Sequence, residues 1–146
     1  MTKSHIGHDS KIKSKSKITS LVQIGGYSTI GYGVNIGLSV SLHQWSVVGA
    51  YSMIGMNSTV TRNIPPGSLA VGSPARIVGP NKFSLGKVGI TDTNFWGDYM
   101  LDIDCLSTPN QLIPHVDFFK QEVLDKIQQK ELVGQWRKDA LTLNRH

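Results

Sequence analysis

Two histidines, each with a polar neighbour, are the residues of this sequence best suited to chemistry. His8 is followed directly by Asp9, and His43 is followed directly by Gln44. Imidazole titrates near neutral pH, so a histidine can take a proton from a hydroxyl or an amine under ordinary conditions. A carboxylate beside it can orient the ring or stabilise its charged form. His8 is therefore a candidate general base, although a lone exposed histidine on a repeat is usually inert.

The element that carries these residues is a repeat of six residues. Its aliphatic member is found at Ile6, Ile12, Ile18, Ile24, Ile30, Ile36, Leu42, Val48, Ile54 and Val60. A small or β-branched residue follows four positions later, and glycine is favoured directly after the aliphatic residue, where we expect it to relieve a turn. An amphipathic helix needs apolar residues three and four positions apart, which this period does not supply. The pattern predicts a mainly β protein, a parallel β-helix in which each hexad forms a strand and a corner.

Side chains that are eighteen positions apart are expected to share one column of this β-helix. Three hexads close a triangular coil, so the ten hexads give a little over three coils, which stack at about 4.8 Å. Counting by eighteen places Gly26 above His8 and Tyr27 above Asp9, with Gln44 one coil further on. The backbone N–H of Gly26 is accessible and could serve as an oxyanion donor. Tyr27 could equally anchor a subunit interface.

The part of the chain after the hexads is expected to close the barrel. Residues 61–67 contain two adjacent prolines and a glycine and are predicted as a turn. Residues 68–78 are predicted as a final irregular strand. We therefore divide the chain into a β-helix over residues 1–80 and a loop and helical region over residues 81–146.

The carboxyl-terminal region is predicted to end in a helix. Residues 91–115 are expected to form a loop, because Gly97, Pro109 and Pro114 break regular structure. Residues 116–143 are predicted as a helix that Asp117 caps and that breaks near Gly134. Its apolar stripe consists of Val116, Phe119, Val123 and Ile127. Such a stripe is usually a packing surface, against the barrel or against a neighbouring subunit.

Composition limits the partners and the compartment. The formal net charge is +5, which suits an acidic partner, and one cysteine, Cys105, leaves no intrachain disulfide and suits a reducing compartment. No apolar run has transmembrane length and no signal peptide is evident, so we expect a cytoplasmic protein without membrane insertion. The outward lysines Lys11, Lys13, Lys15 and Lys17 form either a solvated face or a landing site for an acidic carrier or a phosphate-bearing substrate. No aromatic residue interleaves with them, so nucleic acid is not expected.

Several stretches resemble the UDP-N-acetylglucosamine O-acyltransferases of lipid A biosynthesis. They are Ser4-His5-Ile6-Gly7-His8-Asp9, Gly25-Gly26-Tyr27, Leu42-His43-Gln44-Trp45, the turn from Val60 to Pro65-Pro66-Gly67, and residues 81–89. The hexads are common to many acyltransferases, whereas the His-x-x-His-Asp and His-Gln motifs are more specific. The resemblance covers about residues 4 to 90. It implies a left-handed β-helix, in its short triangular form.

The resemblance also implies a role for each matching residue of the repeat. In that family the second histidine of the first motif, here His8, is the general base, and the aspartate after it is Asp9. The glycine one coil on, here Gly26, offers its N–H to the oxyanion. The His-Gln pair contacts the sugar nucleotide, which assigns substrate binding to His43 and Gln44.

The resemblance extends past the barrel, where this sequence also departs from the family. Asn81 and Lys87 match family residues that lie near the phosphates of the nucleotide and the acyl carrier. Tyr27, which we also assign to substrate binding, stands where the family has a histidine. Phe83 replaces an acidic residue and Val88 replaces a basic one. These departures leave the identity of the acceptor open. Family members also carry further coils ahead of the first motif.

We therefore expect an acyltransferase that moves an acyl group from a thioester to a hydroxyl or amine of a nucleotide sugar. The thioester, on acyl carrier protein or coenzyme A, is a co-substrate, and no permanently bound cofactor or metal is expected. Because flat prism faces pack with threefold symmetry, we expect a homotrimer with its site between subunits. Acyl carrier protein and a nucleotide sugar are the expected partners.

Three alternatives remain open at this stage. The phrase Gly72-Ser73-Pro74-Ala75-Arg76-Ile77 also resembles the end of acetyl-CoA-dependent sugar acetyltransferases. A zinc carbonic anhydrase shares the prism, although the histidines here lack the spacing that it needs. A trimeric β-helix scaffold without catalysis would bind no thioester donor.

Overall fold

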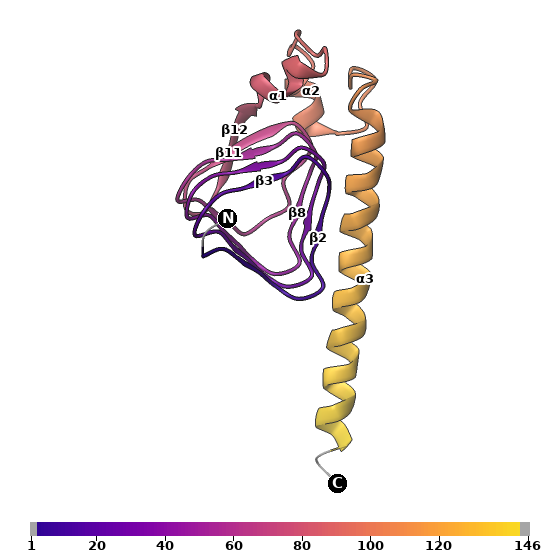
Figure 1. Ribbon diagram of the computed structural model, residues 1–146. Helices are drawn as coiled ribbons and strands as arrows, with labels where there is room; N and C mark the ends of the chain where they lie inside the picture. The colour runs from indigo at the N-terminus through magenta and orange to yellow at the C-terminus, as the bar shows by residue number, and fades with distance from the viewer. Residues whose placement is uncertain (1–2, 144–146) are drawn as a thin grey trace.

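The hexads form a triangular prism in the computed structural model, which describes residues 3–143 and the side chains of residues 3–132 (Figure 1). Each hexad contributes one strand of two residues. The strands are β1 His5–Ile6, β2 Lys11–Ile12, β3 Lys17–Ile18, β4 Gln23–Ile24, β5 Thr29–Ile30, β6 Asn35–Ile36, β7 Ser41–Leu42, β8 Val47–Val48, β9 Met53–Ile54 and β10 Thr59–Val60, followed by β11 Ser68–Val71 and β12 Arg76–Pro80. The predicted parallel β-helix is confirmed.

Three parallel sheets make the three faces of the prism. The first face is β1-β4-β7-β10, the second is β2-β5-β8, and the third is β3-β6-β9-β11 with β12 at its edge. His5 pairs with Gln23 and Ile6 with Ile24, which confirms a coil of eighteen residues. The first corner is the set of turns between the first and second faces (residues 7–10, 25–28 and 43–46). The second corner is the set between the second and third faces (residues 13–16, 31–34 and 49–52).

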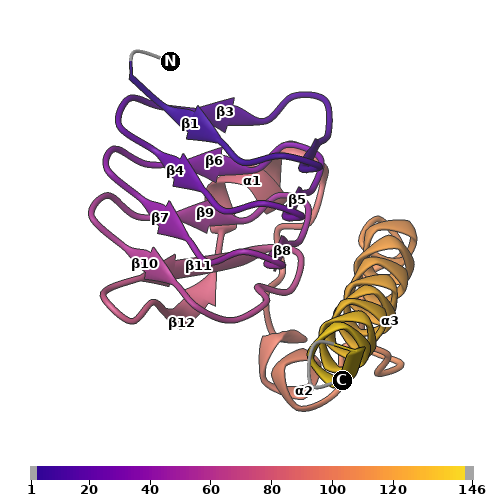
Figure 2. The ribbon, with the colours of Figure 1, turned by 90° about the horizontal axis from the view of Figure 1, so that it is seen from below.

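The predicted left-handed winding can be followed in the figures. In Figure 1 the chain runs anticlockwise from the first face to the second and then to the third. Figure 2 shows the prism from below, with the amino-terminal coil at the top of the picture. That coil is nearest to the viewer in Figure 1, and each later coil lies further away. Anticlockwise rotation that recedes from the viewer is left-handed. The aliphatic residues point inward, and Ile24, Ile30, Ile36, Val48, Ile54 and Val60 are buried in one core.

Glycine follows the aliphatic residue because two coils approach each other closely there. A Cβ on Gly25 would lie 2.4 Å from the backbone nitrogen of Gln44, and one on Gly49 would lie 2.3 Å from that of Pro66. Our expectation that these glycines relieve the turn was wrong, since the left-handed backbone comes two residues later. Residues there, such as Asp9 and Tyr27, have φ near 57–58° and are mostly not glycine.

The small residue of the hexad has a polar role at the corner. Ser16 Oγ donates to the carbonyl oxygen of Gly31 at 2.8 Å, and Ser52 Oγ donates to that of Pro65 at 2.9 Å. A hydroxyl in this place donates to a backbone carbonyl oxygen of the next coil. This explains why serine is frequent at a position that is crowded and largely buried.

The fourth coil departs from the eighteen-residue period. Ile64, which the repeat placed at a corner, is 3% exposed and bridges Val48, so it takes an inward position two residues early. The predicted single strand over 68–78 is instead a hairpin, in which β11 pairs antiparallel with β12. The coil count thereby reaches about four rather than a little over three.

The remaining chain forms three helices, α1 Lys82–Lys87, α2 Trp96–Leu101 and α3 Ile113–Leu143. The predicted loop over 91–115 was therefore wrong in part, because α2 contains Gly97 and α3 begins before Asp117 with Pro114 in its first turn, where proline is tolerated. The break predicted near Gly134 is not present in α3. Within residues 3–143, no helix has the length and hydropathy needed to cross a membrane.

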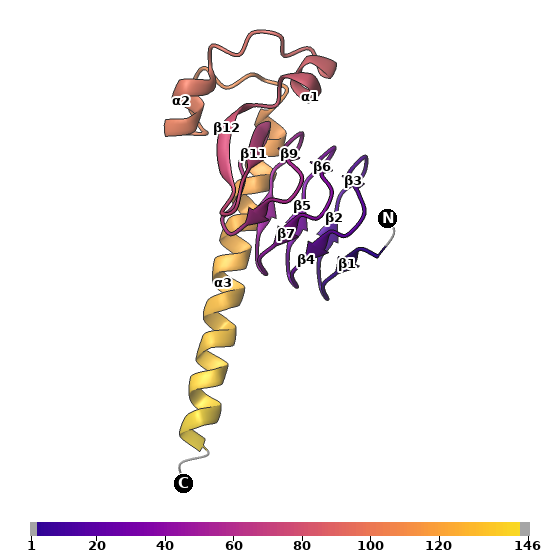
Figure 3. The same ribbon diagram turned by 90° about the vertical axis from the view of Figure 1, so that its left-hand side faces the viewer.

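A second hydrophobic cluster joins these helices to the end of the prism. Leu85, Phe95, Tyr99, Leu112 and Val116 are buried in it. The hydroxyl of Tyr99 donates to the carbonyl oxygen of Pro66 at 2.7 Å, which ties α2 to the fourth coil. Figure 3 shows α1 and α2 above the prism and α3 running past it.

Helix α3 packs against the second face with a stripe that is partly charged. Val116 and Phe119 are buried as predicted, but Ile127 is 48% exposed, and Glu122 and Lys126 are buried instead. Glu122 accepts hydrogen bonds from Thr29 Oγ1 at 2.7 Å and Lys11 Nζ at 3.1 Å, while its other near cation, Lys126 Nζ, lies at 3.9 Å. Figures 1 and 2 show α3 beside the second face, where its backbone contacts β8.

Replacing Glu122 with Ala is expected to lower the free energy of unfolding by roughly 3 kcal/mol, because it leaves the buried Lys126 without its partner. Burial alone would raise the pKa of Glu122, but the bonds from Thr29 and Lys11 outweigh it and lower that pKa. A lowered pKa stabilises the fold above the ordinary value of 4.5, and the contribution disappears as pH falls through the folded-state pKa. Urea unfolding at several pH values measures both effects, with the exposed Glu131→Ala as control. Equal stability of the two variants would contradict the prediction.

Candidate functional site

His8 lies in the first turn of the first corner, directly after β1. Its Nδ1 is 3.1 Å from Asp9 Oδ2, and the two side chains are 74% and 66% exposed. An exposed pair of this kind contributes little stability. The pair does affect the chemistry of the ring. When Nδ1–H donates to the carboxylate, the free lone pair of the imidazole is on Nε2. The geometry thus favours the tautomer in which Nε2 can accept a proton.

Gly26 lies against the Nε2 side of His8. A Cβ built on Gly26 would be 3.1 Å from His8 Nε2 and 3.2 Å from its Cε1, so the missing side chain makes room for the imidazole. The neighbouring N–H groups of Gly25 and Tyr27 donate to Leu42 and His8 carbonyls. The Gly26 N–H donates to no acceptor in the described chain. A free donor and a potential base therefore stand side by side.

An aromatic column rises from His8 along the same corner. The ring of Tyr27 is perpendicular to that of His8, with centroids 4.9 Å apart and an interplanar angle of 87°. Trp45, one coil further, stacks on Tyr27 at 4.3 Å and 6°. Both aromatic residues are half-buried. Tyr27 lies at the corner position that counting by eighteen assigned to it, and Trp45 lies one coil further along the same corner.

His43 and Gln44 occupy the same corner, on the third coil. His43 Nδ1 lies 2.9 Å from the carbonyl oxygen of Gln44, so Nδ1 carries the hydrogen and Nε2 faces solvent as an acceptor. Both side chains are exposed. The first corner therefore presents His8, Gly26, His43 and Gln44 together, as the sequence predicted. Among the described side chains, no three His, Cys, Asp or Glu residues gather as metal ligands would.

Asn81 and Lys87 do not lie at the first corner. Asn81 directly precedes α1 and is 6% exposed, and its Nδ2 donates to the carbonyl oxygen of Tyr51 at 2.8 Å and to Ser84 Oγ at 3.0 Å. Its amide thus fixes the start of α1 to the second corner. Lys87 is exposed, with Nζ 4.2 Å from the centroid of the Phe83 ring. The structure therefore separates these two predicted site residues from His8.

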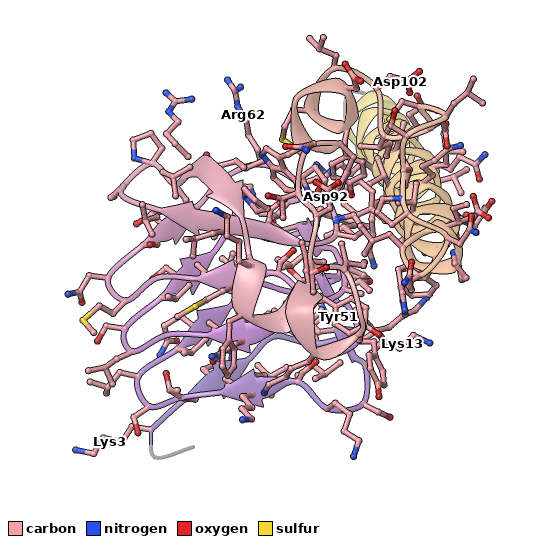
Figure 4. The ribbon with its side chains drawn as sticks, turned by 90° about the horizontal axis from the view of Figure 1, so that it is seen from above. Lys3, Lys13, Tyr51, Arg62, Asp92 and Asp102 are labelled. Atoms are coloured by element: carbon pink, nitrogen blue, oxygen red, sulfur yellow. The ribbon has the colours of Figure 1, made fainter. Side chains whose placement is uncertain are left out.

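A cavity of about 340 Å³ lies between α1 and the third face. Figure 4 looks onto this face and shows Tyr51 at its edge, near the α1 segment. Lys15 and Lys17 from the first coil and Lys87 from α1 line the cavity, and no acidic residue does so. Lys15 and Lys17 belong to the lysine set that the sequence offered as a landing site for a phosphate-bearing substrate, whereas Tyr51 was missed. Tyr51 shares one column of the repeat with Lys15, so counting by eighteen could have found it.

The chain is similar in sequence and in structure to proteins of known activity. No family model matches the chain. The acyl-[acyl-carrier-protein]–UDP-N-acetylglucosamine O-acyltransferases of Burkholderia thailandensis and Burkholderia pseudomallei are each 34% identical to it over 87 residues. That match covers 60% of this chain and 33% of each relative, so the chain spans about a third of the length of these relatives.

Solved structures of similar fold include the same kind of protein. LpxA from Acinetobacter baumannii is 25% identical, with a TM-score of 0.61, over 88% of this chain and 50% of its own. UDP-N-acetylglucosamine O-acyltransferase from Moraxella catarrhalis is 23% identical, with a TM-score of 0.62, over 86% of this chain and 52% of its own. A perosamine N-acetyltransferase from Caulobacter crescentus, solved with CoA and GDP-perosamine, shares the fold at 23% identity and a TM-score of 0.54, over 54% of this chain and 38% of its own. The chain resembles hexapeptide-repeat acyltransferases in sequence and in fold.

Proposed function

We propose that this chain is an acyltransferase that moves an acyl group from a thioester to a hydroxyl or amine of a nucleotide sugar. The observation that carries the proposal is the contact between His8 and Gly26. It joins a potential general base, with Nδ1 held by Asp9, to a backbone N–H that has no acceptor in the described chain. Acyl transfer needs these two groups on either side of one tetrahedral intermediate.

The reaction would proceed by direct attack on the thioester. His8 Nε2 accepts the proton of the acceptor hydroxyl as its oxygen bonds to the thioester carbonyl carbon. The carbonyl oxygen becomes an oxyanion, which accepts a hydrogen bond from the Gly26 N–H. The carbon–sulfur bond then breaks, and the leaving thiolate takes the proton back from the imidazolium. Asp9 stabilises that imidazolium, and His43 and Gln44 position the sugar.

The separation of the predicted site residues favours a site between subunits of a homotrimer. His8 lies on the first corner, whereas Lys87 and Asn81 lie beside the second corner. The second face, which α3 covers, lies between these corners in each protomer. A cyclic assembly brings unlike surfaces of neighbouring protomers together. His8 of one protomer would thereby meet the α1 cavity of the next.

The charge of the α1 cavity supports a phosphate-bearing substrate. Lys15, Lys17 and Lys87 line it without an acidic residue, and such a cluster attracts anions. A nucleotide diphosphate and the phosphopantetheine arm of an acyl carrier protein or coenzyme A both meet this requirement. The similar relatives are named for acyl carrier protein and UDP-N-acetylglucosamine, and we propose the same classes here. Both are co-substrates rather than permanently bound cofactors, and the proposal places the protein in the cytoplasm.

Purified protein incubated with a thioester donor and a UDP-sugar is expected to yield an acylated sugar, which mass spectrometry detects. Hydroxyacyl chains on acyl carrier protein and acetyl-CoA are supplied in separate reactions with UDP-N-acetylglucosamine. Product from the carrier-bound donor, and not from acetyl-CoA, supports the O-acyltransferase assignment. Product with acetyl-CoA alone would indicate a sugar acetyltransferase. No product and no thermal shift with any donor or acceptor would contradict the proposal in favour of a scaffold.

A further inference from the structure

We propose that Tyr27 is a positioning residue for His8, and that it acts through its ring rather than through its hydroxyl. This inference rests on the proposed role of His8 as general base. It assigns Tyr27 a role within the protein instead of the contact with substrate that its position first indicated. An exposed imidazole needs contacts that keep it in one orientation.

The His8 side chain has few contacts that restrict it. It is 74% exposed, and its bond to Asp9 joins two solvated groups, which is a weak restraint. The ring of Tyr27, perpendicular to His8 at a centroid distance of 4.9 Å, supplies an extended contact. Perpendicular packing at this distance is a preferred arrangement of aromatic rings. The contact restricts rotation of the imidazole.

Tyr27 can hold His8 because Tyr27 is itself held on two sides. Its backbone N–H donates to the carbonyl oxygen of His8 at 2.9 Å, and its φ of 58° fixes the direction in which its side chain leaves the corner. Its ring stacks on Trp45 at 4.3 Å and 6°. Trp45 in turn donates its backbone N–H to the Gly26 carbonyl oxygen at 3.0 Å. The orientation of the His8 ring thus depends on Tyr27, and through Tyr27 on Trp45 of the third coil.

This arrangement should affect the chemical step more than substrate binding. Nε2 is useful only while it remains beside the Gly26 N–H, because base and oxyanion donor act on the same substrate. A small displacement of a catalytic group lowers the rate sharply without weakening binding of the ground state. Loss of the Tyr27 ring should therefore lower kcat and leave KM nearly unchanged.

The test compares three variants of the full chain in the acyl-transfer assay. Tyr27→Ala is expected to lower kcat about tenfold with KM within about twofold of wild type. Tyr27→Phe, which keeps the ring, should stay within about twofold in both constants. Trp45→Ala should reproduce part of the loss. If Tyr27→Phe loses as much as Tyr27→Ala, or if KM rises while kcat is unchanged, the proposal is overturned.

A second measurement needs no substrate and so separates this inference from the proposed function. The NMR signal of the His8 Cε1 proton, assigned by its absence in His8→Ala, should carry a ring-current shift from Tyr27. The shift should be lost in Tyr27→Ala and kept in Tyr27→Phe, with His5 as an internal reference. An unchanged His8 signal in Tyr27→Ala would refute the contact even if acyl transfer is confirmed. If Tyr27→Ala fails to fold, Tyr27→Leu, which removes the aromatic ring and keeps most of its bulk, supplies the same comparison.

Discussion

His8→Ala is expected to lower the rate of acyl transfer by about 10²–10⁴-fold, the range that general-base catalysis contributes. The variant removes the acceptor of the hydroxyl proton, whereas the Gly26 N–H and the α1 cavity stay in place. KM for the nucleotide sugar should therefore change little. The measurement is kcat at saturating donor and acceptor. Because the wild-type imidazole is 74% exposed, added imidazole should reach the vacated space and restore part of the rate.

His5→Ala is the matched control for this prediction. His5 lies in β1 of the same coil, points outward from the first face and is exposed. It has no hydrogen-bond partner for its ring among the described residues, so its loss should leave both rate and stability near wild type. A rate for His8→Ala within about threefold of His5→Ala would rule out His8 as the base, since even a weak general base contributes about 10²-fold.

Two inactive variants are expected to restore activity to each other when they share a trimer. His8→Ala disables the first corner, and Lys87→Glu reverses the charge at the α1 cavity, so each homotrimer should be nearly inactive. If the site joins the first corner of one protomer to the α1 cavity of the next, a mixed trimer contains some intact sites. Random mixing of equal amounts makes about a quarter of all sites intact, because each site draws one half from each of two protomers. In the mixed trimers alone, about one site in three is intact.

Co-expression with two different affinity tags isolates the mixed trimers for the assay. The matched control combines His8→Ala with Gly26→Ala. Both changes alter the first corner, so no protomer of a mixed trimer has an intact first corner. That pair should stay inactive. If neither pair recovers activity, the site lies within one protomer. A protein that is monomeric in solution would lead to the same conclusion.

The repeat made much of the fold predictable. A six-residue period is a local signal, and the coils that it builds contact only their neighbours, so the register of His5 with Gln23 followed from counting. The same counting placed Gly26 above His8 and Tyr27 above Asp9. It failed at Ile64, because a shortened coil breaks the period, and the hairpin of β11 and β12 has no hexad pattern.

The helical region was harder to predict, because its packing depends on contacts between distant parts of the chain. The stripe on α3 was expected to be apolar, yet Glu122 and Lys126 are buried in it, since Lys11 and Thr29 of the second face supply polar partners. Ile127, which fits the stripe by spacing, is 48% exposed. Helical periodicity shows which residues share a face and does not show what that face meets.

The sequence by itself determined the β-helix, the inward ladder of aliphatic residues and the set of side chains at the first corner, because all three follow from spacing along the chain. Only the tertiary structure decided that the His8 ring lies against Gly26, that α3 covers the second face, and that Lys87 joins Lys15 and Lys17 around a cavity away from His8. These outcomes depend on side-chain orientation and on helix docking. Both are fixed by contacts across the fold, which no repeat in the sequence encodes.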